Sequence, residues 1–210
     1  MSDSYSWRGA MEDKSLLTLG HSNHDLDRFV QLARSAGAEV VADVRTVPHS
    51  QYTPHFNREP LRRSLTQAGL GYVFLGVELG GRPTGQHFYD NTGHVHYDRV
   101  AKSELFLAGL ARLRKGAAEN RVALMCSEGH PAECHRHLLI SRVLLEEGFS
   151  ISHVLPDETT IDAEELLASQ RPEPTLFGQE EMTWRSIRLV SPNTALESSS
   201  ENSEPLESTD

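Results

Sequence analysis

The sequence predicts an α/β fold, with one open, mostly parallel sheet of about five strands and helices on both of its faces. Short apolar runs alternate along the chain with longer segments in which apolar residues recur at helical spacing. Glycine or proline stands at most junctions between these segments, as is typical of turns. The chain of 210 residues is long enough for one such domain and a tail.

The first strand is predicted over 15–20, where the apolar run SLLTLG ends in glycine. A helix is predicted to follow over 24–37, with Gly37 as its stop and Asn23 as its cap. Its apolar residues at helical spacing are Leu26, Phe29, Val30 and Ala33.

The segment EVVADVR (39–45) predicts a buried second strand. A helix over 58–69 follows it, because Pro60 is tolerated in a first helical turn. The short run YVFLG (72–76) predicts the third strand.

A long helix is predicted over 98–117 and a fourth strand over 121–126. The segment 133–148 predicts another helix, which Gly148 closes, and 150–156 predicts the fifth strand. Strands that alternate with helices in this way form parallel sheets.

The net charge of −10 is confined to the C-terminal part of the chain. Residues 1–156 hold 17 acidic and 17 basic side chains, whereas the rest holds 13 acidic and three basic ones. We therefore expect a flexible N-terminus (1–14), an α/β domain (15–156), a partly ordered acidic extension (157–190) and a disordered tail (191–210). A short outer helix is expected within the extension, over 162–170.

No run of about 18 apolar residues exists, so no membrane-spanning helix is expected. The N-terminal segment lacks the apolar centre of a secretory signal, which favours a cytoplasmic location. In a reducing compartment the two cysteines would remain thiols.

Polar residues follow several predicted strands, where a parallel sheet binds its ligands. The loop 20–23 is either a helix cap or a set of amides that faces an anion. Asp43 and Arg45 lie on one face of their strand, where they either pair with each other or, as we favour, line a pocket. The loop 76–97 carries five glycines and several histidines, and we favour a lid over a disordered insertion.

The segment CSEGHPAECHR (126–136) is the most informative. Cys126 ends a buried strand and is either a small core residue or a nucleophile. Cys134 is expected in the first turn of a helix, where the helix dipole favours a thiolate. Arg136 falls on the core-facing stripe of that helix with Ile140, so it needs a carboxylate or a bound anion as its partner.

Three other functions are considered for the segment 126–136: zinc binding, a phosphatase loop and thiol chemistry. Structural zinc sites usually separate paired cysteines by two to four residues, whereas seven residues separate Cys126 from Cys134 and no second pair exists. We therefore assign no metal ligand, although a site of both cysteines and a histidine stays open. A tyrosine-phosphatase-like loop is excluded, because Ala132 stands where its arginine is required. A thiol-redox pair and rhodanese-like thiol chemistry stay open.

Four segments in this order resemble the domain of unknown function 488 family: LTLGHSN, VVADVRTVPHSQYTPHFN, YVFLGVELGG and VALMCSEGHPAECHRHLLISRVLLEEGFSISHVL. The resemblance spans about residues 16–155. It implies an α/β domain in cytoplasmic bacterial or archaeal proteins and supplies no established reaction. It places the site on motifs whose members here include Pro48 and Glu78.

The sequence thus predicts an enzyme, a hydrolase or a transferase, that acts on a nucleotide or another phosphorylated small molecule; no cofactor is assigned and the oligomeric state stays open. A thiol-redox or metal-binding protein and a nucleic-acid-associated module are the alternatives, and the neutral body disfavours the latter. The candidate catalytic residues are Asp43, Cys126, Glu128 and Cys134. The candidate ligand-binding residues are His21, Ser22, Asn23, Arg45, Gly80, Gly81, His135 and Arg136.

Overall fold

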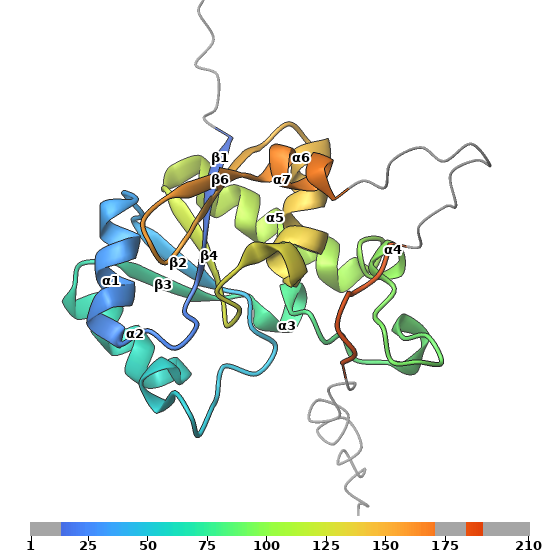
Figure 1. The fold of residues 1–210 in the computed structure, drawn as a ribbon, viewed down its shortest axis with the longest axis horizontal. Coiled ribbons are helices and arrows are strands. Elements are labelled where there is room, and N and C mark those ends of the chain that lie inside the picture. The colour runs from blue at the N-terminus through green and yellow to red at the C-terminus, as the bar shows by residue number, and fades with distance from the viewer. Residues whose placement is uncertain (1–13, 171–183, 191–210) are drawn as a thin grey trace, which may run out of the picture.

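A computed structural model describes residues 14–170 and 184–190 of the chain. It confirms the predicted fold class, with a six-stranded open sheet in the order β3-β2-β4-β1-β5-β6 and helices on both faces (Figure 1). Every neighbouring pair is parallel except the last, in which β6 runs antiparallel to β5. The predicted tail (191–210) and all but the last residue of the predicted flexible N-terminus lie outside the described residues.

The five predicted strands all form, and a sixth joins them. The strands are β1 (Ser15–Gly20), β2 (Val40–Asp43), β3 (Gly71–Phe74), β4 (Val122–Cys126), β5 (Ser150–Val154) and β6 (Thr160–Asp162). β1 and β4 lie side by side at the centre, where Gly20 pairs with Cys126. The carboxyl ends of β1, β2 and β4 therefore meet at one edge of the sheet.

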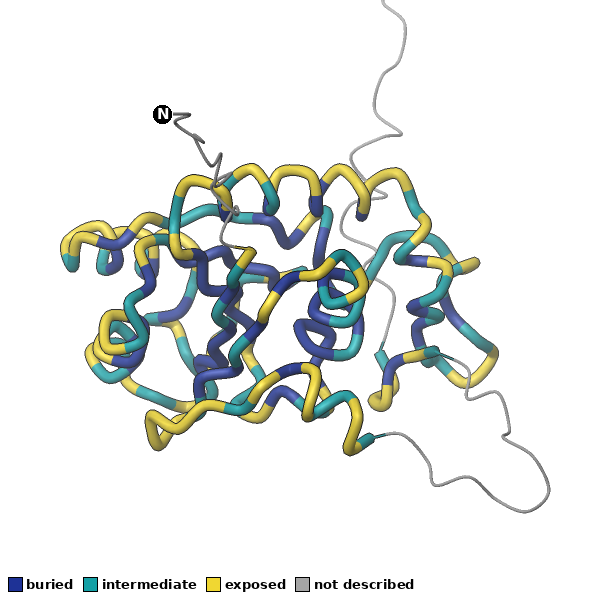
Figure 2. Tube along the Cα trace, turned by 90° about the horizontal axis from the view of Figure 1, so that it is seen from above, coloured by how far each residue is buried: buried dark blue, intermediate teal, exposed yellow. Residues whose placement is uncertain are grey.

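Two hydrophobic clusters bury the two faces of the sheet. On one face, α1 (Leu26–Ser35) and α2 (Arg58–Gln67) pack with the 3-10 turn η1 (Pro54–Phe56) over Val41 and Met125. Figure 2 shows that the buried stretches of the chain lie inside the molecule and that the exposed stretches lie along its outside.

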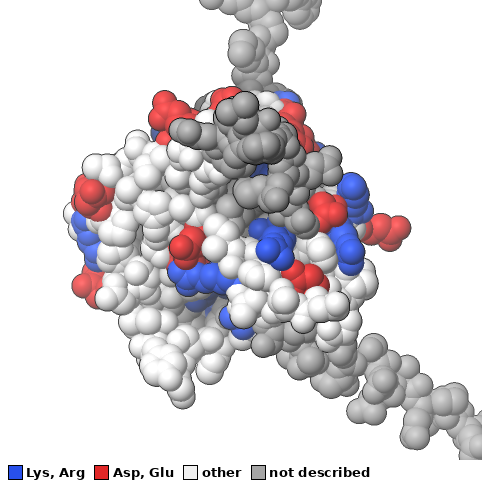
Figure 3. Space-filling model, turned by 45° about the vertical axis from the view of Figure 1, so that its right-hand side comes forward, with Lys and Arg blue, Asp and Glu red and all other residues white. Residues whose placement is uncertain are grey.

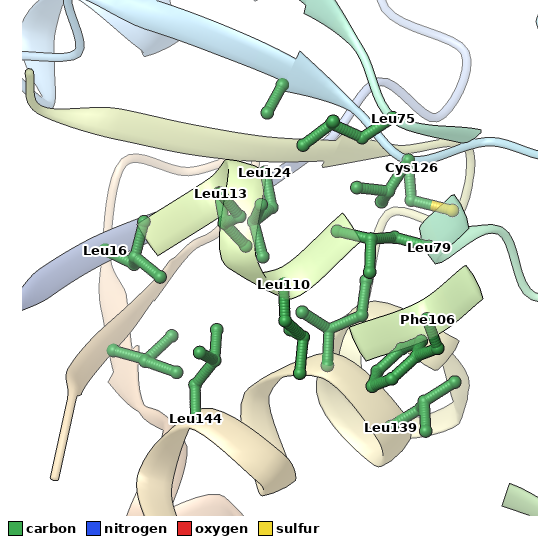
Figure 4. Close-up of a cluster of buried hydrophobic side chains, with 14 of the residues drawn as sticks. Leu16, Leu75, Leu79, Phe106, Leu110, Leu113, Leu124, Cys126, Leu139 and Leu144 are labelled. Carbon is green, nitrogen blue, oxygen red and sulfur yellow. The ribbon is translucent and has the colours of Figure 1, made fainter. Parts of the chain in front are cut away.

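The opposite face is covered by the later helices. These are α5 (Glu104–Glu119), the π-helical segment η4 (Arg136–Ser141), α6 (Arg142–Glu146) and α7 (Ala163–Ser169). Figure 4 shows leucines of α5 and α6 around this core, with Cys126 at one margin of the drawn side chains. A buried cysteine at the end of a core strand thus lies where the core meets the edge of the sheet.

Two predicted helix boundaries are wrong. Asn23 does not cap α1; Asp25 does, since its carboxylate accepts a hydrogen bond from the Arg28 amide at 2.7 Å. The predicted helix over 98–117 is interrupted, because Ser103 starts α5 anew by accepting a hydrogen bond from the Phe106 amide. Serine and aspartate compete well for free amides at helix starts, which the apolar spacing alone does not reveal.

The loop 76–97 is ordered and is not a disordered insertion. Its short elements are α3 (Gly76–Leu79) and η2 (Gln86–Phe88), and it leads into α4 (Tyr97–Val100). Tyr89 is buried in the core and forms a bridge with Val95. The role of this loop as a lid stays a prediction.

The acidic extension is partly described. It contains β6 and α7, which confirms the expected outer helix, and the segment 184–190. Trp184 lies against the body of the domain, with its indole N–H donating to the Leu138 carbonyl at 2.7 Å. Arg185 forms a bridge with His96. Among the described helices, none combines the length and apolarity needed to cross a membrane.

Candidate functional site

A pocket of about 390 Å³ opens at the carboxyl ends of β2 and β4. Its deep end is formed by the buried residues Cys126 and His135 together with Glu128. The arginines Arg45 and Arg82 also line it. The other lining residues are Thr46, Val47, His49, Gly81, Tyr97, Ser127, Glu133, Ser186, Arg188, Leu189 and Val190.

Four side chains with reactive atoms converge at the deep end. The thiols of Cys126 and Cys134 both donate to one carboxylate oxygen of Glu128, at 2.8 Å and 3.2 Å. Nδ1 of His135 lies 3.6 Å from the first sulfur and 3.8 Å from the second. The structure thus brings together three of the four predicted catalytic residues and one predicted ligand-binding residue.

The charge states in this group follow from burial and contact. Burial raises the pKa of the Cys126 thiol well above its ordinary value. Burial also acts to raise the pKa of Glu128, but the hydrogen bond from Cys126 and the nearby His135 outweigh it, and the pKa falls to about 2. At neutral pH Glu128 is therefore a carboxylate and Cys126 is a neutral thiol. A neutral thiol is a poor nucleophile.

Cys134 lies before the helix and not within its first turn as predicted, because the π-helical segment η4 begins at Arg136 and Cys134 caps the end of the 3-10 turn Pro131–Glu133. Its carbonyl accepts hydrogen bonds from the amides of His137 and Leu138, at 3.0 Å and 2.9 Å. Its sulfur accepts one from the Arg136 amide at 3.5 Å. The helix start therefore directs an N–H group at the sulfur.

His135 is held from both sides. Its Nε2 donates to the Val44 carbonyl at 3.0 Å, so Nδ1 is the nitrogen that faces the sulfurs. A Cβ atom on Gly81 would lie 2.8 Å from Cγ of the ring, so only glycine permits this approach. This contact explains the place of Gly81 in the site.

A second polar group lies on the other face of the sheet, around Asp43. This carboxylate is fully buried and accepts hydrogen bonds from Arg45 at 2.9 Å and 2.7 Å and from the Tyr72 hydroxyl at 2.9 Å. Asp43 does not line the pocket, and it orients Arg45, which does. The predicted pairing of the two residues and the predicted pocket position of Arg45 therefore coexist.

His21 joins the two groups at the edge of the sheet. Its Nε2 lies 3.3 Å from an Arg45 nitrogen, and its amide donates to the Cys126 carbonyl at 2.9 Å. Burial, reinforced by Arg45, lowers the pKa of His21 to about 4. The neutral ring accepts from Arg45 and donates from Nδ1 to the Ser22 carbonyl at 2.9 Å.

Residues 25–143, more than half of the chain, match the family described as domain of unknown function DUF488. The chain belongs to this family. No curated protein and no solved structure matches it. The matched region of this DUF488 protein contains both polar groups around the pocket, whereas His21 and the segment 184–190 lie outside it.

Arg136 points into the protein as predicted. The prediction that its partner is a carboxylate or a bound anion is wrong. The side chain is fully buried and absent from the pocket lining of this DUF488 protein. Its guanidinium donates to the carbonyls of Glu128 at 2.5 Å and Gly129 at 2.9 Å, and to the Thr18 hydroxyl at 3.3 Å. Arg136 therefore shapes the loop that carries Glu128.

The loop after β1 has no amides directed at the pocket of this DUF488 protein. The Ser22 amide donates to the Ser127 carbonyl at 2.9 Å, and Asn23 is exposed outside the pocket lining. Gly80 is buried against Thr46, where a Cβ atom would lie 2.4 Å from the hydroxyl oxygen. These three predicted ligand-binding residues lie next to the site without lining it.

Sequence reasoning missed the part of the acidic extension that lines the DUF488 pocket. Ser186, Arg188 and Leu189 line it, and Arg188 pairs with Glu133 at 2.8 Å. The sequence WRSIRLV (184–190) is an apolar and basic island within an acidic stretch. That contrast in composition was the available signal.

Proposed function

We propose that this DUF488 protein is an enzyme, a hydrolase or a transferase, that binds a small anionic molecule such as a nucleotide or a sugar phosphate in the pocket. The observation that carries the proposal is the convergence of Cys126, Glu128 and His135 at the deep end of a cavity with arginines in its lining. The volume of about 390 Å³ falls within the range of small-molecule sites.

Arginine placement supports an anionic ligand. Arg45 is paired with Asp43, and Arg188 is paired with Glu133. Arg82 is exposed and has no ion pair with any residue in the described part of the chain. Of the arginines that line the pocket, Arg82 is the one whose guanidinium is best able to bind a phosphate or carboxylate in bidentate geometry.

The reacting groups are Glu128 and the thiol and imidazole beside it. The low pKa of Glu128 keeps it a carboxylate at neutral pH, where it accepts hydrogen bonds from both thiols. Asp43 is not one of the reacting groups, because its carboxylate oxygens accept hydrogen bonds from Arg45 and Tyr72. The proposal includes a cytoplasmic location, where both thiols would stay reduced.

Two other functions have weaker support. Both cysteines are free thiols, and each donates a hydrogen bond to Glu128 instead of forming a disulfide with the other. The face shown in Figure 3 carries basic and acidic side chains in small groups among uncharged residues. Such a mixed face offers little attraction to a nucleic-acid backbone.

The proposal is tested by isothermal titration of the full chain with a panel of nucleotides, sugar phosphates and small carboxylates, followed by chromatographic detection of products. We expect saturable binding of at least one anion, weakened about 10- to 100-fold by Arg82→Ala, as for a lost charge-assisted hydrogen bond. The matched control is Arg63→Ala, an exposed arginine of α2 outside the pocket. No saturable binding, or equal loss in both variants, would overturn the proposal.

A further inference from the structure

We infer that the deep end of the pocket is a zinc site, with Cys126, Cys134 and His135 as fixed ligands and Glu128 as the fourth, exchangeable ligand. Each of these residues offers one donor atom, and the four atoms lie within 4.8 Å of one another. The presence of this site does not depend on the proposed enzymatic function, although its catalytic role does.

The distances from the two sulfurs to the imidazole nitrogen fit a tetrahedral zinc ion. Zinc–sulfur bonds of about 2.3 Å and zinc–nitrogen bonds of about 2.0–2.1 Å at the tetrahedral angle separate sulfur from nitrogen by about 3.5 Å. Nδ1 of His135 lies 3.6 Å and 3.8 Å from the two sulfurs. An ion bound by these three side chains would therefore require only small movements of them. The Glu128 oxygen, now 2.8 Å and 3.2 Å from the two sulfurs, would move away from them to become the fourth ligand.

The imidazole is oriented as a metal ligand. Histidine ligands commonly donate their second ring N–H to a carboxylate or backbone carbonyl, which fixes the free nitrogen toward the metal. Here the Val44 carbonyl accepts from Nε2 at 3.0 Å, and Gly81 packs against the ring. The ring is thus positioned before any ion binds.

The two cysteines and the loop between them are also held in place. Cys126 and Cys134 are 2% and 1% exposed. The loop between them is fixed by Arg136, which binds the carbonyls of Glu128 and Gly129. Two thiolates and an imidazole form a donor set that selects zinc over magnesium or calcium.

Glu128 is the ligand that can exchange. It lines the pocket and is partly exposed, whereas both sulfurs are buried. A zinc ion with two thiolates is neutral, so an anion from the pocket can replace this carboxylate without a change in net charge. When bound, zinc would act there as a Lewis acid toward an oxygen of the ligand.

The test begins with the full chain, expressed with added zinc and purified under reducing conditions without chelator. Inductively coupled plasma mass spectrometry should find about one zinc ion per chain. Zinc affinity, measured by competition with a chromophoric chelator, should fall by about 100-fold or more in Cys126→Ser, Cys134→Ser and His135→Asn, at or above the effect of losing an outer hydrogen-bond partner. Glu128→Gln should retain zinc with a smaller loss, and the exposed His87→Asn should bind as the wild type does.

A second measurement needs no variant that risks misfolding. Cobalt titrated into the metal-free wild-type chain should give thiolate-to-cobalt charge-transfer absorption and the intense visible bands of tetrahedral coordination. Absence of both zinc and these bands, zinc retention in the two serine variants, or an isolated chain with a Cys126–Cys134 disulfide would each overturn the inference. Zinc binding without anion binding would overturn only the proposed function, and anion binding to a chain that takes up no metal would overturn only the zinc site.

Discussion

At the scale of single residues, Gly20 has no room for a side chain. A Cβ atom there would lie 1.9 Å from the carbonyl oxygen of Glu128, which is backbone and cannot rotate away. Gly20 also pairs with Cys126 in the central pair of strands. The close approach of β1 to the loop 127–133 therefore depends on glycine at this position.

Replacing Gly20 with alanine should destabilise the protein by about 1–3 kcal/mol, the usual cost of overpacking. Urea unfolding followed by circular dichroism measures this change. The control is Gly116→Ala in α5, where a Cβ atom would meet nothing closer than 4.0 Å. That control should be stabilised by about 0.5–1 kcal/mol, because alanine is the better helix former. Equal stabilities for both variants would contradict the close approach at Gly20.

Arg136 should contribute mainly to stability, because its guanidinium satisfies two buried carbonyls. Arg136→Leu leaves those carbonyls without a donor, at about 1–3 kcal/mol each. We expect a loss of at least about 2 kcal/mol in the free energy of unfolding, again from urea titration. Arg62→Leu, at an arginine whose side chain is 56% exposed, should change it by less than about 0.5 kcal/mol.

The sequence predicts the direction of Arg136 but not its partner. Helical spacing with Ile140 places both residues on the buried face, and this inference needs only local geometry. The partners are carbonyls of a loop whose path depends on the whole sheet. For the same reason the spacing of the cysteines assigned no metal ligand and left a site of both cysteines and a histidine open, since the position of Glu128 and His135 relative to the sulfurs is set by that loop and by Val44.

At the scale of elements, the helix predicted over 133–148 is divided. The 3-10 turn η3 (Pro131–Glu133) precedes the helical part, which consists of the π-helical segment η4 followed by α6. The Ser141 hydroxyl donates to the Arg136 carbonyl, five residues earlier, at 2.7 Å. Apolar spacing predicts that a helix exists here, but the wider turn follows from the buried polar groups that it must accommodate.

A chain of buried hydrogen bonds runs from β1 to α7 on this side of the sheet. The Thr18 hydroxyl accepts from the Arg136 guanidinium and donates to Nδ1 of His153 at 2.7 Å. Nε2 of His153 then donates to Nδ1 of His137 at 2.9 Å, and His137 donates to the Gln170 side chain at 3.2 Å. All donors point the same way, which requires both imidazoles to be neutral.

This chain predicts a loss of stability in acid. Burial, reinforced by His137, lowers the pKa of His153 from 6.5 to about 2. The unfolded chain therefore binds the proton first, so stability is complete above about pH 6.5 and falls as the pH is lowered. His153→Gln should reduce the slope of unfolding free energy against pH, between about pH 5.5 and 4, by about 1 kcal/mol per pH unit.

The measurement is urea unfolding at a series of pH values, for the wild type and both variants. The exposed His87→Gln serves as the control and should leave the slope unchanged. An unchanged slope in His153→Gln would show that the ring is not held neutral in the folded state.

At the scale of the whole molecule, local patterns predicted the strands and their parallel arrangement but not the segment that completes the pocket. Five strands were recognisable because each is a short apolar run. β6 has only three residues, Thr160–Asp162, and has no such signal. The segment 184–190 reaches the pocket through contacts with residues far away in sequence, which no local pattern encodes.

Trp184 is one attachment of that segment, in addition to the hydrogen bonds of Ser186 to Val95. Its ring lies 4.4 Å from the Arg142 guanidinium, and its N–H donates to the Leu138 carbonyl. Trp184→Ala should loosen the segment and expose Cys126, raising its rate of reaction with a thiol reagent about tenfold in the metal-free Cys134→Ser background. Trp184→Phe, which keeps the ring, should raise it much less, and equal rates in all three proteins would contradict this role.

The short length of β6 affects whether a second molecule can add a strand to this edge of the sheet. An unpaired outer strand is a template on which a second chain can add and start aggregation. Here that outer strand is three residues long and runs directly into α7, so an incoming chain would find few backbone groups with which to pair. The antiparallel strand β6 therefore hinders the addition of a further strand at that edge of the sheet.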